Sequence, residues 1–172
     1  MTFPFRLEPL GGEHERSLFG CGENALDRYF HTQVTQDIRR RVANCFVAVE
    51  TVTRRIAAYY TISAASIPLV DLPPHETKRL PRYPTVPAVR IGRLAVDLRF
   101  QGRGLGAALL ADAATRTLNA DAAAFTLLVD AKNDQAVAFY QRFGFRILAS
   151  RPRTLFLPLA TARKAFRRKD AH

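Results

Sequence analysis

The spacing of apolar residues predicts a helix in the first part of the chain and strands after it. A strand-like stretch covers residues 5–10, and Asn24 can then cap a helix whose apolar positions recur three or four residues apart: Leu26, Tyr29, Phe30, Val34 and Ile38. The arginines at 39–41 would end this helix, since their charge suits the negative end of its dipole. Residues 42–50 and 56–67, rich in β-branched and aromatic side chains, are predicted to form a β-hairpin.

The stretch from residue 68 to residue 87 cannot form a regular strand, because six prolines interrupt it. It also carries three basic residues, Lys78, Arg79 and Arg82. We expect a basic excursion on the surface, where loops commonly carry recognition, with one helical turn around residues 75–80.

The strand predicted at 88–97 changes phase along its length. Val89 and Ile91 keep one parity, and Leu94 and Val96 keep the other, so the slip falls near Gly92-Arg93. A slip of one residue reverses the faces of a strand, and a β-bulge is the usual way to accommodate it. A strand buried on both faces would give the same pattern without a bulge.

The second half of the chain alternates between helix and strand. The predicted elements are a helix at 103–119, a strand at 125–131, a short helix from Asn133 or Asp134 through residue 142, and strands at 145–150 and 154–159. Gly144 is expected at the left-handed position that ends the short helix. The pattern predicts one α/β (α+β) domain over residues 1–172, and its basic end at 163–172 is the part most prone to fray.

Length and composition add few constraints. A chain of 172 residues, 48% of them hydrophobic, can bury one core of ordinary size. No apolar stretch approaches the ~20 residues that span a bilayer, and the first residues do not resemble a signal peptide, so we expect a cytoplasmic protein with no membrane partner. Cys21 and Cys45 have no CxxC pair or histidine at ligand spacing, which predicts buried thiols and no metal.

The formal net charge of +11 predicts a polyanionic partner. Nearly all the basic residues are arginines, whose planar guanidinium group matches phosphate and stacks on bases. A genome biased towards Arg and Ala codons would give the same excess, and the alanine-rich stretch at 120–124 is consistent with such a bias.

Three glycines in Gly102-Arg103-Gly104-Leu105-Gly106 come directly after a predicted strand and open a predicted helix. This arrangement leaves backbone N–H groups free to bind phosphate, assisted by the positive end of the helix dipole. The glycine spacing is wrong for a dinucleotide fingerprint, and no Gly-Lys-Ser/Thr follows as in a nucleotide P-loop. A glycine turn that only lets a helix pack remains the alternative.

The segment Arg93-Leu94-Ala95-Val96-Asp97, followed by Gln101-x-x-Gly104-x-Gly106, resembles motif A of the GNAT superfamily of N-acetyltransferases. Residues 133–145 resemble motif B of the same superfamily. The resemblance implies a central mixed, twisted sheet of six to seven strands flanked by about four helices, with a bulged, splayed strand at the site of acetyl-CoA.

The same resemblance implies the residues that would hold acetyl-CoA. Backbone groups of Leu94, Ala95 and Val96 would face the acetyl group and the pantetheine arm. The phosphates would lie on Gln101, Gly102, Arg103, Gly104, Leu105 and Gly106. Asn133, Ala136 and Phe139 would line the other side of the cofactor.

Tyr140 is the predicted catalytic residue. Acyl transfer from a thioester expels a thiolate, and a phenol near the sulfur can donate a proton as that charge develops. The alternative is that Tyr140 only belongs to an aromatic helix stripe, because Phe139 and Phe143 flank it.

A closer resemblance, to the acetyltransferase toxins of bacterial type II toxin-antitoxin systems, covers nearly the whole chain. It rests on Cys21-Gly22-x-x-x-Leu26-x-Arg28-Tyr29, Arg40-Arg41-Val42-Ala43, Tyr59-Tyr60-Thr61-Ile62-Ser63-Ala64, Val129-Asp130-Ala131-Lys132 and Leu155-Phe156-Leu157-Pro158-Leu159, besides motif A. It implies acetylation of the α-amine of aminoacyl-tRNA, which blocks translation. It also implies a ribbon-helix-helix antitoxin, operator DNA bound through the toxin-antitoxin complex, and a homodimer as one possible assembly.

That substrate suits the composition of the chain. An α-amine beside an ester is less basic than a lysine amine and needs no carboxylate base. The tRNA would supply the polyanion that the charge predicts. The candidate tRNA-binding residues, each of which could instead be a simple solvated charge, are Arg39, Arg40, Lys78, Arg79, Arg82, Arg90 and Arg93.

Two other functions remain open at this stage. The chain could acetylate a small amine or a protein amine, although clustered carboxylates, which such substrates favour, are few here. It could also be a non-catalytic, nucleic-acid-binding regulatory module that keeps a vestigial cofactor fold. The intact glycines and Tyr140 argue against the second function.

Overall fold

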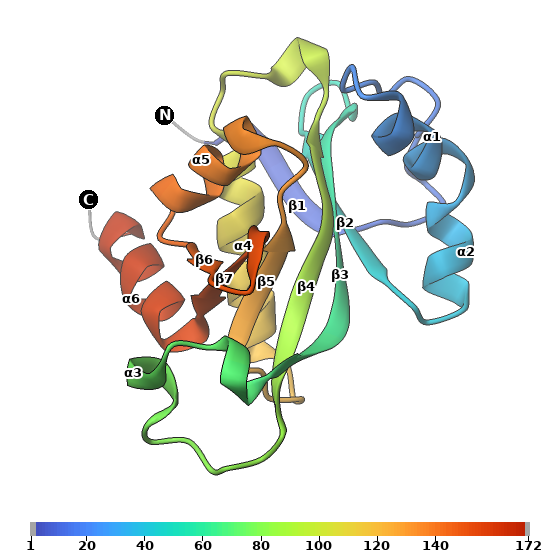
Figure 1. Cartoon of the computed structure of the whole chain (residues 1–172). Coiled ribbons are helices and arrows are strands. Elements are labelled where there is room, and N and C mark those ends of the chain that lie inside the picture. The colour runs from blue at the N-terminus through green and yellow to red at the C-terminus, as the bar shows by residue number, and fades with distance from the viewer. Residues whose placement is uncertain (1–2, 171–172) are drawn as a thin grey trace. The chain divides into compact units, whose positions relative to one another are not determined.

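The computed structural model describes residues 3–170 and the side chains of residues 3–166. The chain forms two compact units, one made of Met1–Ser63 with Gly92–Asp112, and the other of Ala64–Ile91 with Ala113–His172. Three elements run from one unit into the other: β3 (Ile56–Pro68), β4 (Thr85–Val96) and α4 (Leu105–Asn119) (Figure 1).

The predicted mixed α/β sheet is confirmed. Besides β3 and β4, its strands are β1 (Phe5–Pro9), β2 (Asn44–Glu50), β5 (Thr126–Asp130), β6 (Arg146–Leu148) and β7 (Arg151–Pro158). In the described part of the chain the seven strands follow the order β1-β2-β3-β4-β5-β7-β6. β4 and β5 pair in parallel, whereas β1 with β2, β2 with β3, β5 with β7 and β6 with β7 pair antiparallel.

In the first unit, two helices stand where the sequence predicted one. The chain leaves helical geometry at Gln33, between α1 (Asn24–Thr32) and α2 (Val34–Arg39). Asn24 is the first helical residue and not the cap, because Glu23 occupies the N-cap position and makes no side-chain cap hydrogen bond. The predicted cap was therefore wrong by one residue.

The core of this unit joins α1 to the predicted hairpin of β2 and β3. The ring of Phe30 stacks on that of Tyr59 at 4.2 Å between centroids, and the ring of Phe19 packs edge-on against both. The hydroxyl of Tyr59 donates to the carbonyl of Leu26 at 2.7 Å. The apolar face predicted for the helix is thus the face that packs on the sheet.

β4 changes phase, but not in the way predicted. Val86 and Ala88 are buried at even positions and Ile91 and Ala95 at odd positions, so the change falls between Ala88 and Ile91 and not at Gly92-Arg93. Val89, Leu94 and Val96, on which the prediction rested, are only half-buried. The described pairing with β5 covers Ala88–Ile91 without a shift of register, while β4 runs on to Val96.

In the second unit, the proline-rich stretch is an excursion with short helical turns, η1 (Leu69–Asp71) and α3 (Pro74–Thr77). The backbone N–H of Leu69 donates to the carbonyl of Pro84 at 3.0 Å, which closes the excursion at its base. Leu69, Leu72 and Val86 are buried in the core cluster that includes Leu128, Leu148 and Phe156. The excursion is therefore anchored to the sheet at both ends.

Two more helices, α5 (Asp134–Arg142) and α6 (Leu159–Asp170), pack against β7. The sequence did not predict α6, and residues 163–170, expected to fray, are helical; residues 171–172 lie outside the described chain. Buried Leu159 and Ala162 attach this helix, and the Leu159 N–H donates to the Phe125 carbonyl at 2.9 Å. Among the described residues, no helix has both the length and the apolarity needed to cross a bilayer.

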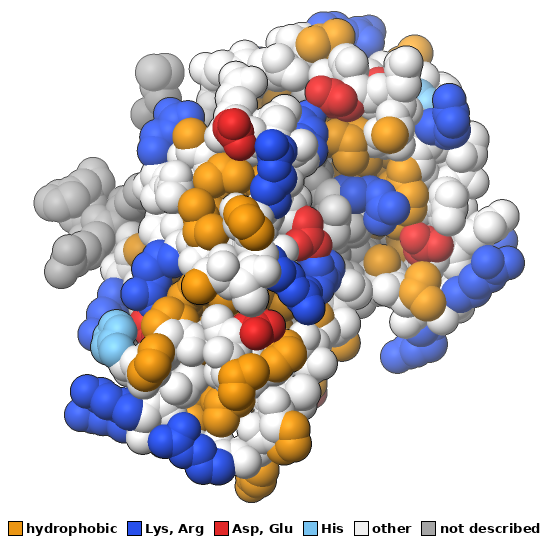
Figure 2. Space-filling view, viewed as in Figure 1, with side chains coloured by type: hydrophobic (Ala, Val, Ile, Leu, Met, Phe, Trp, Pro, Cys, Tyr) orange, Lys and Arg blue, Asp and Glu red, His pale blue; other side chains and the backbone are white. Residues whose placement is uncertain are grey.

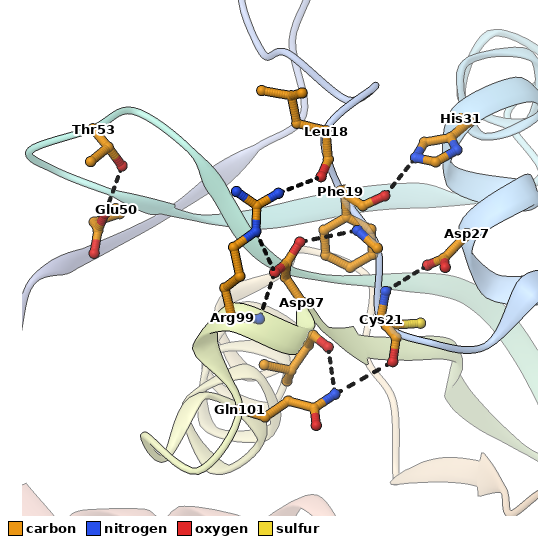
Figure 3. A network of polar contacts seen from close by, with 12 residues as sticks. Leu18, Phe19, Cys21, Asp27, His31, Glu50, Thr53, Asp97, Arg99 and Gln101 are labelled. Atoms are coloured by element: carbon orange, nitrogen blue, oxygen red, sulfur yellow. Dashed lines mark hydrogen bonds and ion pairs between the residues drawn. The ribbon is translucent and has the colours of Figure 1, made fainter.

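A buried carboxylate fixes the turn after β4 (Figure 3). Asp97 is 3% exposed, and its Oδ2 accepts from the backbone N–H of Gly20 at 3.0 Å. Its Oδ1 accepts from the N–H of Arg99 at 2.8 Å. Asp97 therefore joins the loop before α1 to η2 (Leu98–Phe100), the turn that leads out of β4.

Replacing Asp97 should destabilise the protein through these two N–H groups. Asp97→Ala leaves both donors without their partner and should lower the free energy of unfolding by about 2–4 kcal/mol. Asp97→Asn keeps one acceptor oxygen and should lower it by about half as much. Urea unfolding measures both, and Asp121→Ala, at an exposed aspartate, serves as the control with a change below about 0.5 kcal/mol. Equal stability of Asp97→Ala and the control would contradict this role.

Candidate active site

The glycine-rich loop occupies the junction between η2 and α4. Gly102 and Gly104 have φ angles of +79° and +81°, a region that other residues rarely adopt. A Cβ atom at either position would meet nothing within 4 Å, so backbone conformation and not lack of space requires glycine here. The loop opens the 15-residue helix α4, whose first N–H groups lack intrahelical acceptors. This end of the helix can bind an anion.

The side chains of Gln101 and Arg103 differ in where they point and what they contact. The side-chain amide of Gln101 donates to the carbonyls of Val96, at 3.1 Å, and Cys21, at 3.4 Å, so it holds the loop against the end of β4 (Figure 3). Arg103 is exposed, and its guanidinium carbon lies 5.0 Å from the ring centroid of Phe5. Its Nη1 is 3.8 Å from Oε2 of Glu50, which balances part of its charge.

The last part of β4 provides backbone groups near this loop. Ala95 is buried in the core of the first unit, whereas Leu94 and Val96 are half-buried. Gly92 stands where a Cβ atom would lie 3.1 Å from Oγ1 of Thr61, a tight contact that would require the Thr61 side chain to shift by a few tenths of an ångström. Gly92–Val96 is the stretch beyond the described pairing with β5. Its backbone groups on that edge are the candidates to pair with an extended ligand.

In the second unit, Tyr140 lies on α5 in an apolar setting. Its ring packs against Phe139 at 5.2 Å and Phe145 at 5.6 Å between centroids, so the predicted aromatic stripe exists. Burial raises the pKa of Tyr140 to about 12, and the negative charge of Asp130 contributes. The hydroxyl therefore stays protonated at neutral pH and can act as a donor.

Packing does not occupy the hydroxyl itself. In the described part of the chain it has no hydrogen-bond partner, and no buried side-chain polar atom there is left unsatisfied. The hydroxyl of this otherwise buried side chain must therefore reach solvent. A ligand entering from solvent can accept its hydrogen bond.

Sequence reasoning assigned no role to Asp130, the last residue of β5. Thr154 donates to its Oδ1 at 2.8 Å, and Arg90 forms an ion pair with its Oδ2. Because Asp130 acts electrostatically on Tyr140, it belongs to the surroundings of that hydroxyl. The signals in the sequence were its position at the carboxyl end of a predicted strand and its place in the segment Val129-Asp130-Ala131-Lys132.

The residues at α5 that were predicted to contact the cofactor also have roles in the helix itself. The Asn133 side chain caps α5 by accepting from the N–H of Ala136 at 2.8 Å, which settles the choice between Asn133 and Asp134. Phe139 is half-buried, and Gly144 ends the helix with a φ of +94°, as predicted. Asn133, Ala136 and Phe139 would contribute to a cofactor site by packing against the ligand.

The seven basic candidates fall into both units. In the first, Arg39 and Arg40 are exposed at the end of α2, and the guanidinium of Arg93 lies 3.5 Å above the ring of Tyr29. In the second, Lys78, Arg79 and Arg82 are exposed on the excursion, whereas Arg90 is paired with Asp130. Within the described residues, therefore, Arg90 already has a carboxylate partner and the other six have none.

One cluster has the composition of a metal site, Glu8, Glu13 and His14. Nδ1 of His14 accepts from the N–H of Gly11 at 2.8 Å, and Nε2 lies 2.8 Å from Oε1 of Glu8. The first contact requires a lone pair on Nδ1, so the ring proton sits on Nε2 and donates to Glu8. These hydrogen bonds of His14 hold the loop after β1 against the end of that strand.

Comparison with known proteins identifies relatives of the chain. Residues 79–154 match the family model of the acetyltransferase (GNAT) domain. The tRNA-acetylating toxin of Mycobacterium tuberculosis is 35% identical over 147 residues, 84% of this chain and 86% of that protein. The probable toxin TacT of Sinorhizobium fredii is 29% identical over 167 residues, 91% of this chain and 92% of that protein.

Solved structures agree with these relatives. AtaT complexed with acetyl-methionyl-tRNAfMet superposes with a TM-score of 0.84 at 28% identity, over 94% of this chain and 99% of that one. A variant of the AtaT toxin bound to the C-terminus of the antitoxin AtaR and acetyl-CoA gives 0.77 at 25%, over 95% and 99%. The KacTA-DNA complex gives 0.76 at 26%, over 95% and 98%.

These findings confirm the resemblance drawn from the motifs. The mycobacterial relative exceeds 30% identity over more than two thirds of both chains. The chain belongs to the GNAT family of N-acetyltransferases, in the group that contains the tRNA-acetylating toxins.

Proposed function

We propose that this chain is the toxin of a type II toxin-antitoxin system and transfers the acetyl group of acetyl-CoA to the α-amine of aminoacyl-tRNA. An N-acetylated aminoacyl group cannot attack in peptide-bond formation, so translation stops. The observation that carries the proposal is the Tyr140 hydroxyl, which is protonated, reaches solvent from an apolar setting and has no hydrogen-bond partner among the described residues.

The glycine loop suits the phosphates of acetyl-CoA. Free N–H groups at the start of α4 and the open surface over Gly102 and Gly104 leave room for a pyrophosphate. Arg103 adds a positive charge, while Gln101 keeps the loop in place from behind. Leu105 and Gly106 would contribute backbone N–H groups, and Leu94–Val96 would pair with the pantetheine arm. Asn133, Ala136 and Phe139 would pack against its other side.

Acetyl-CoA supplies the acetyl group as a thioester. A backbone N–H of the end of β4 polarises the thioester carbonyl, and the neutral amine of the substrate forms the new C–N bond. As the C–S bond breaks, the Tyr140 hydroxyl would donate its proton to the leaving sulfur, and the proton that the amine loses on becoming an amide would return to the tyrosinate through solvent, which restores the neutral phenol. The amine is already largely neutral near pH 7, so the chain needs no carboxylate base.

The partners follow from the same proposal. Aminoacyl-tRNA would bind through its phosphates to Arg39, Arg40, Lys78, Arg79, Arg82 and Arg93, with Arg90 contributing less because Asp130 holds it. A ribbon-helix-helix antitoxin would neutralise the toxin, and the complex would bind operator DNA; AtaT is seen with AtaR, and KacTA with DNA. We also propose a single acetyltransferase domain, a cytoplasmic location and a homodimer.

Tyr140→Phe should separate binding from turnover. The variant keeps the ring contacts, so acetyl-CoA affinity should change less than about twofold, while kcat should fall roughly 10²- to 10⁴-fold because the donor is lost. Calorimetry gives the first quantity, and transfer of labelled acetyl to bulk aminoacyl-tRNA gives the second. Tyr59→Phe removes a core hydroxyl and is the matched control: it should lose stability but keep kcat. Undiminished turnover in Tyr140→Phe would show that Tyr140 only packs.

The pH profile should have one limb. The rate should rise as the substrate amine loses its proton, at or below about pH 8, the range of free α-amines. It should then stay level to about pH 10, because burial raises the pKa of Tyr140 to about 12 and the donor remains protonated. Measuring kcat/KM for aminoacyl-tRNA between pH 6 and pH 10 checks both the rise and the level stretch. A fall between pH 8 and pH 10 would mean that another acid donates the proton.

Salt should distinguish tRNA from a small amine. With aminoacyl-tRNA, log(kcat/KM) should fall steeply against log salt, by roughly 0.7 to 0.9 for each phosphate contacted. Arg40→Gln should make that slope shallower by about the contribution of one phosphate contact. A small amine or a peptide, assayed beside it, should show a shallow dependence. A shallow slope with charged tRNA, or labelling of peptides alone, would exclude the tRNA and leave the acetyltransferase.

A further inference from the structure

Tyr83 has an unusual position among the five tyrosines of the chain. Its side chain is 68% exposed, whereas Tyr29, Tyr59, Tyr60 and Tyr140 are all buried. No ring contact, cation-π contact or hydrogen bond of Tyr83 occurs within the described residues. A single exposed aromatic residue is ordinary. The backbone around Tyr83 and the charges beside it therefore decide whether the ring can bind a ligand.

The frame of Tyr83 is rigid. It lies in Pro81-Arg82-Tyr83-Pro84, where each proline fixes its own φ and Pro84 also holds Tyr83 in extended geometry. The hydrogen bond from Leu69 to the carbonyl of Pro84 ties the next residue to the base of the excursion. The backbone that presents the ring is therefore ordered before any ligand arrives, which lowers the entropic cost of binding.

The neighbours of Tyr83 in the excursion are cations without carboxylate partners. Lys78, Arg79 and Arg82 are exposed and unpaired within the described chain. Glu76 on α3, by contrast, is held by Arg146, which leaves it little charge to oppose them. Figure 2 shows basic and hydrophobic side chains intermingled over α3 and the loop that follows it. A polyanion that also offers flat apolar faces complements such a surface.

Single-stranded nucleic acid has both properties. Its phosphates pair with lysine and arginine, and its unpaired bases stack on aromatic rings. A duplex hides the faces of its bases, so it could use only the cations. We propose that the excursion of residues 69–84 binds an unpaired segment of the nucleic-acid substrate, with one base stacked on Tyr83 and its phosphates on Lys78, Arg79 and Arg82. The inference rests on the proposed function in taking that substrate to be tRNA.

The stacked base is not the nucleotide that carries the amino acid. Residues 85–91 of β4 are extended and separate Thr85, two residues after Tyr83, from Ile91 by about 20 Å at 3.3 Å per residue. Ile91 is level with Val129, next to Asp130, whose charge acts on Tyr140. Tyr83 therefore reads a remote part of the substrate. Its loss should weaken binding of the substrate and leave the chemical step intact.

The chain has no tryptophan, so Tyr83→Trp would place a single fluorophore at this position. Titration with an unpaired ribo-oligonucleotide should quench its emission by stacking, and a duplex of equal length should quench it far less. Arg79→Gln and Arg82→Gln in the same background should weaken the titration. This measurement needs no acetylation, so it is independent of the proposed function.

A kinetic test complements the fluorescence. Tyr83→Ala should raise KM for aminoacyl-tRNA roughly 5- to 150-fold, the range for losing one stacked base, without changing kcat or acetyl-CoA affinity. Tyr83→Phe should restore KM, because the ring and not the hydroxyl stacks. Val52→Ala, at a residue 86% exposed in the turn between β2 and β3 and outside the excursion, is the control and should leave KM unchanged.

Several outcomes would overturn the inference. One is a tryptophan that the oligonucleotide does not quench, together with an unchanged KM in Tyr83→Ala. Another is equal quenching by the duplex and the single strand. A third is an emission shift that depends on protein concentration alone, which would mean that a second copy of the chain covers the ring. Quenching by the single strand with no label on charged tRNA would support the inference and refute the proposed function instead.

Discussion

The buried carboxylate of Asp97 is the interaction on which the candidate site depends. β4 must end, turn and open α4 within a few residues. Asp97 supplies two backbone hydrogen bonds in a buried setting, where charge-assisted bonds are strong. Gln101 adds two more from the other side of the turn. The glycines can then take left-handed geometry without the loop collapsing onto the sheet.

Catalysis in this arrangement would require little ionisable machinery. An enzyme that acetylates lysine must deprotonate a strongly basic amine, but the α-amine of an ester is largely neutral near pH 7. What remains is to orient the thioester and to receive the charge that develops on sulfur. A phenol kept protonated by burial suits the second task, and the dipole of α4 with its free N–H groups suits the first. The excess of arginine can then serve substrate binding.

The periodicity of apolar residues was enough to predict the strands of the sheet and most helices, because each element buries one face. It could not predict the break at Gln33, where an apolar stripe continues across two helices, or α6, in whose described part Leu159 and Ala162 are the buried residues. The glycine loop was predictable because positions with left-handed backbone geometry are usually occupied by glycine. The inward role of Gln101 was not, since an exposed amide looks the same in sequence whichever way it points. Asp130 escaped notice because its ion pair with Arg90 joins two strands whose parallel pairing no local pattern specifies.

The two kinds of glycine in this site differ in how freely evolution can vary them. At Gly92 a methyl group would lie 3.1 Å from the hydroxyl of Thr61, so a substitution there depends on a small shift of the Thr61 side chain. At Gly102 and Gly104 nothing stands in the way of a side chain, and only the backbone angle is restricted. Asparagine and aspartate tolerate that angle better than other residues do. Homologues that carry asparagine in this loop could keep its shape, and a search that insists on glycine there would pass over them.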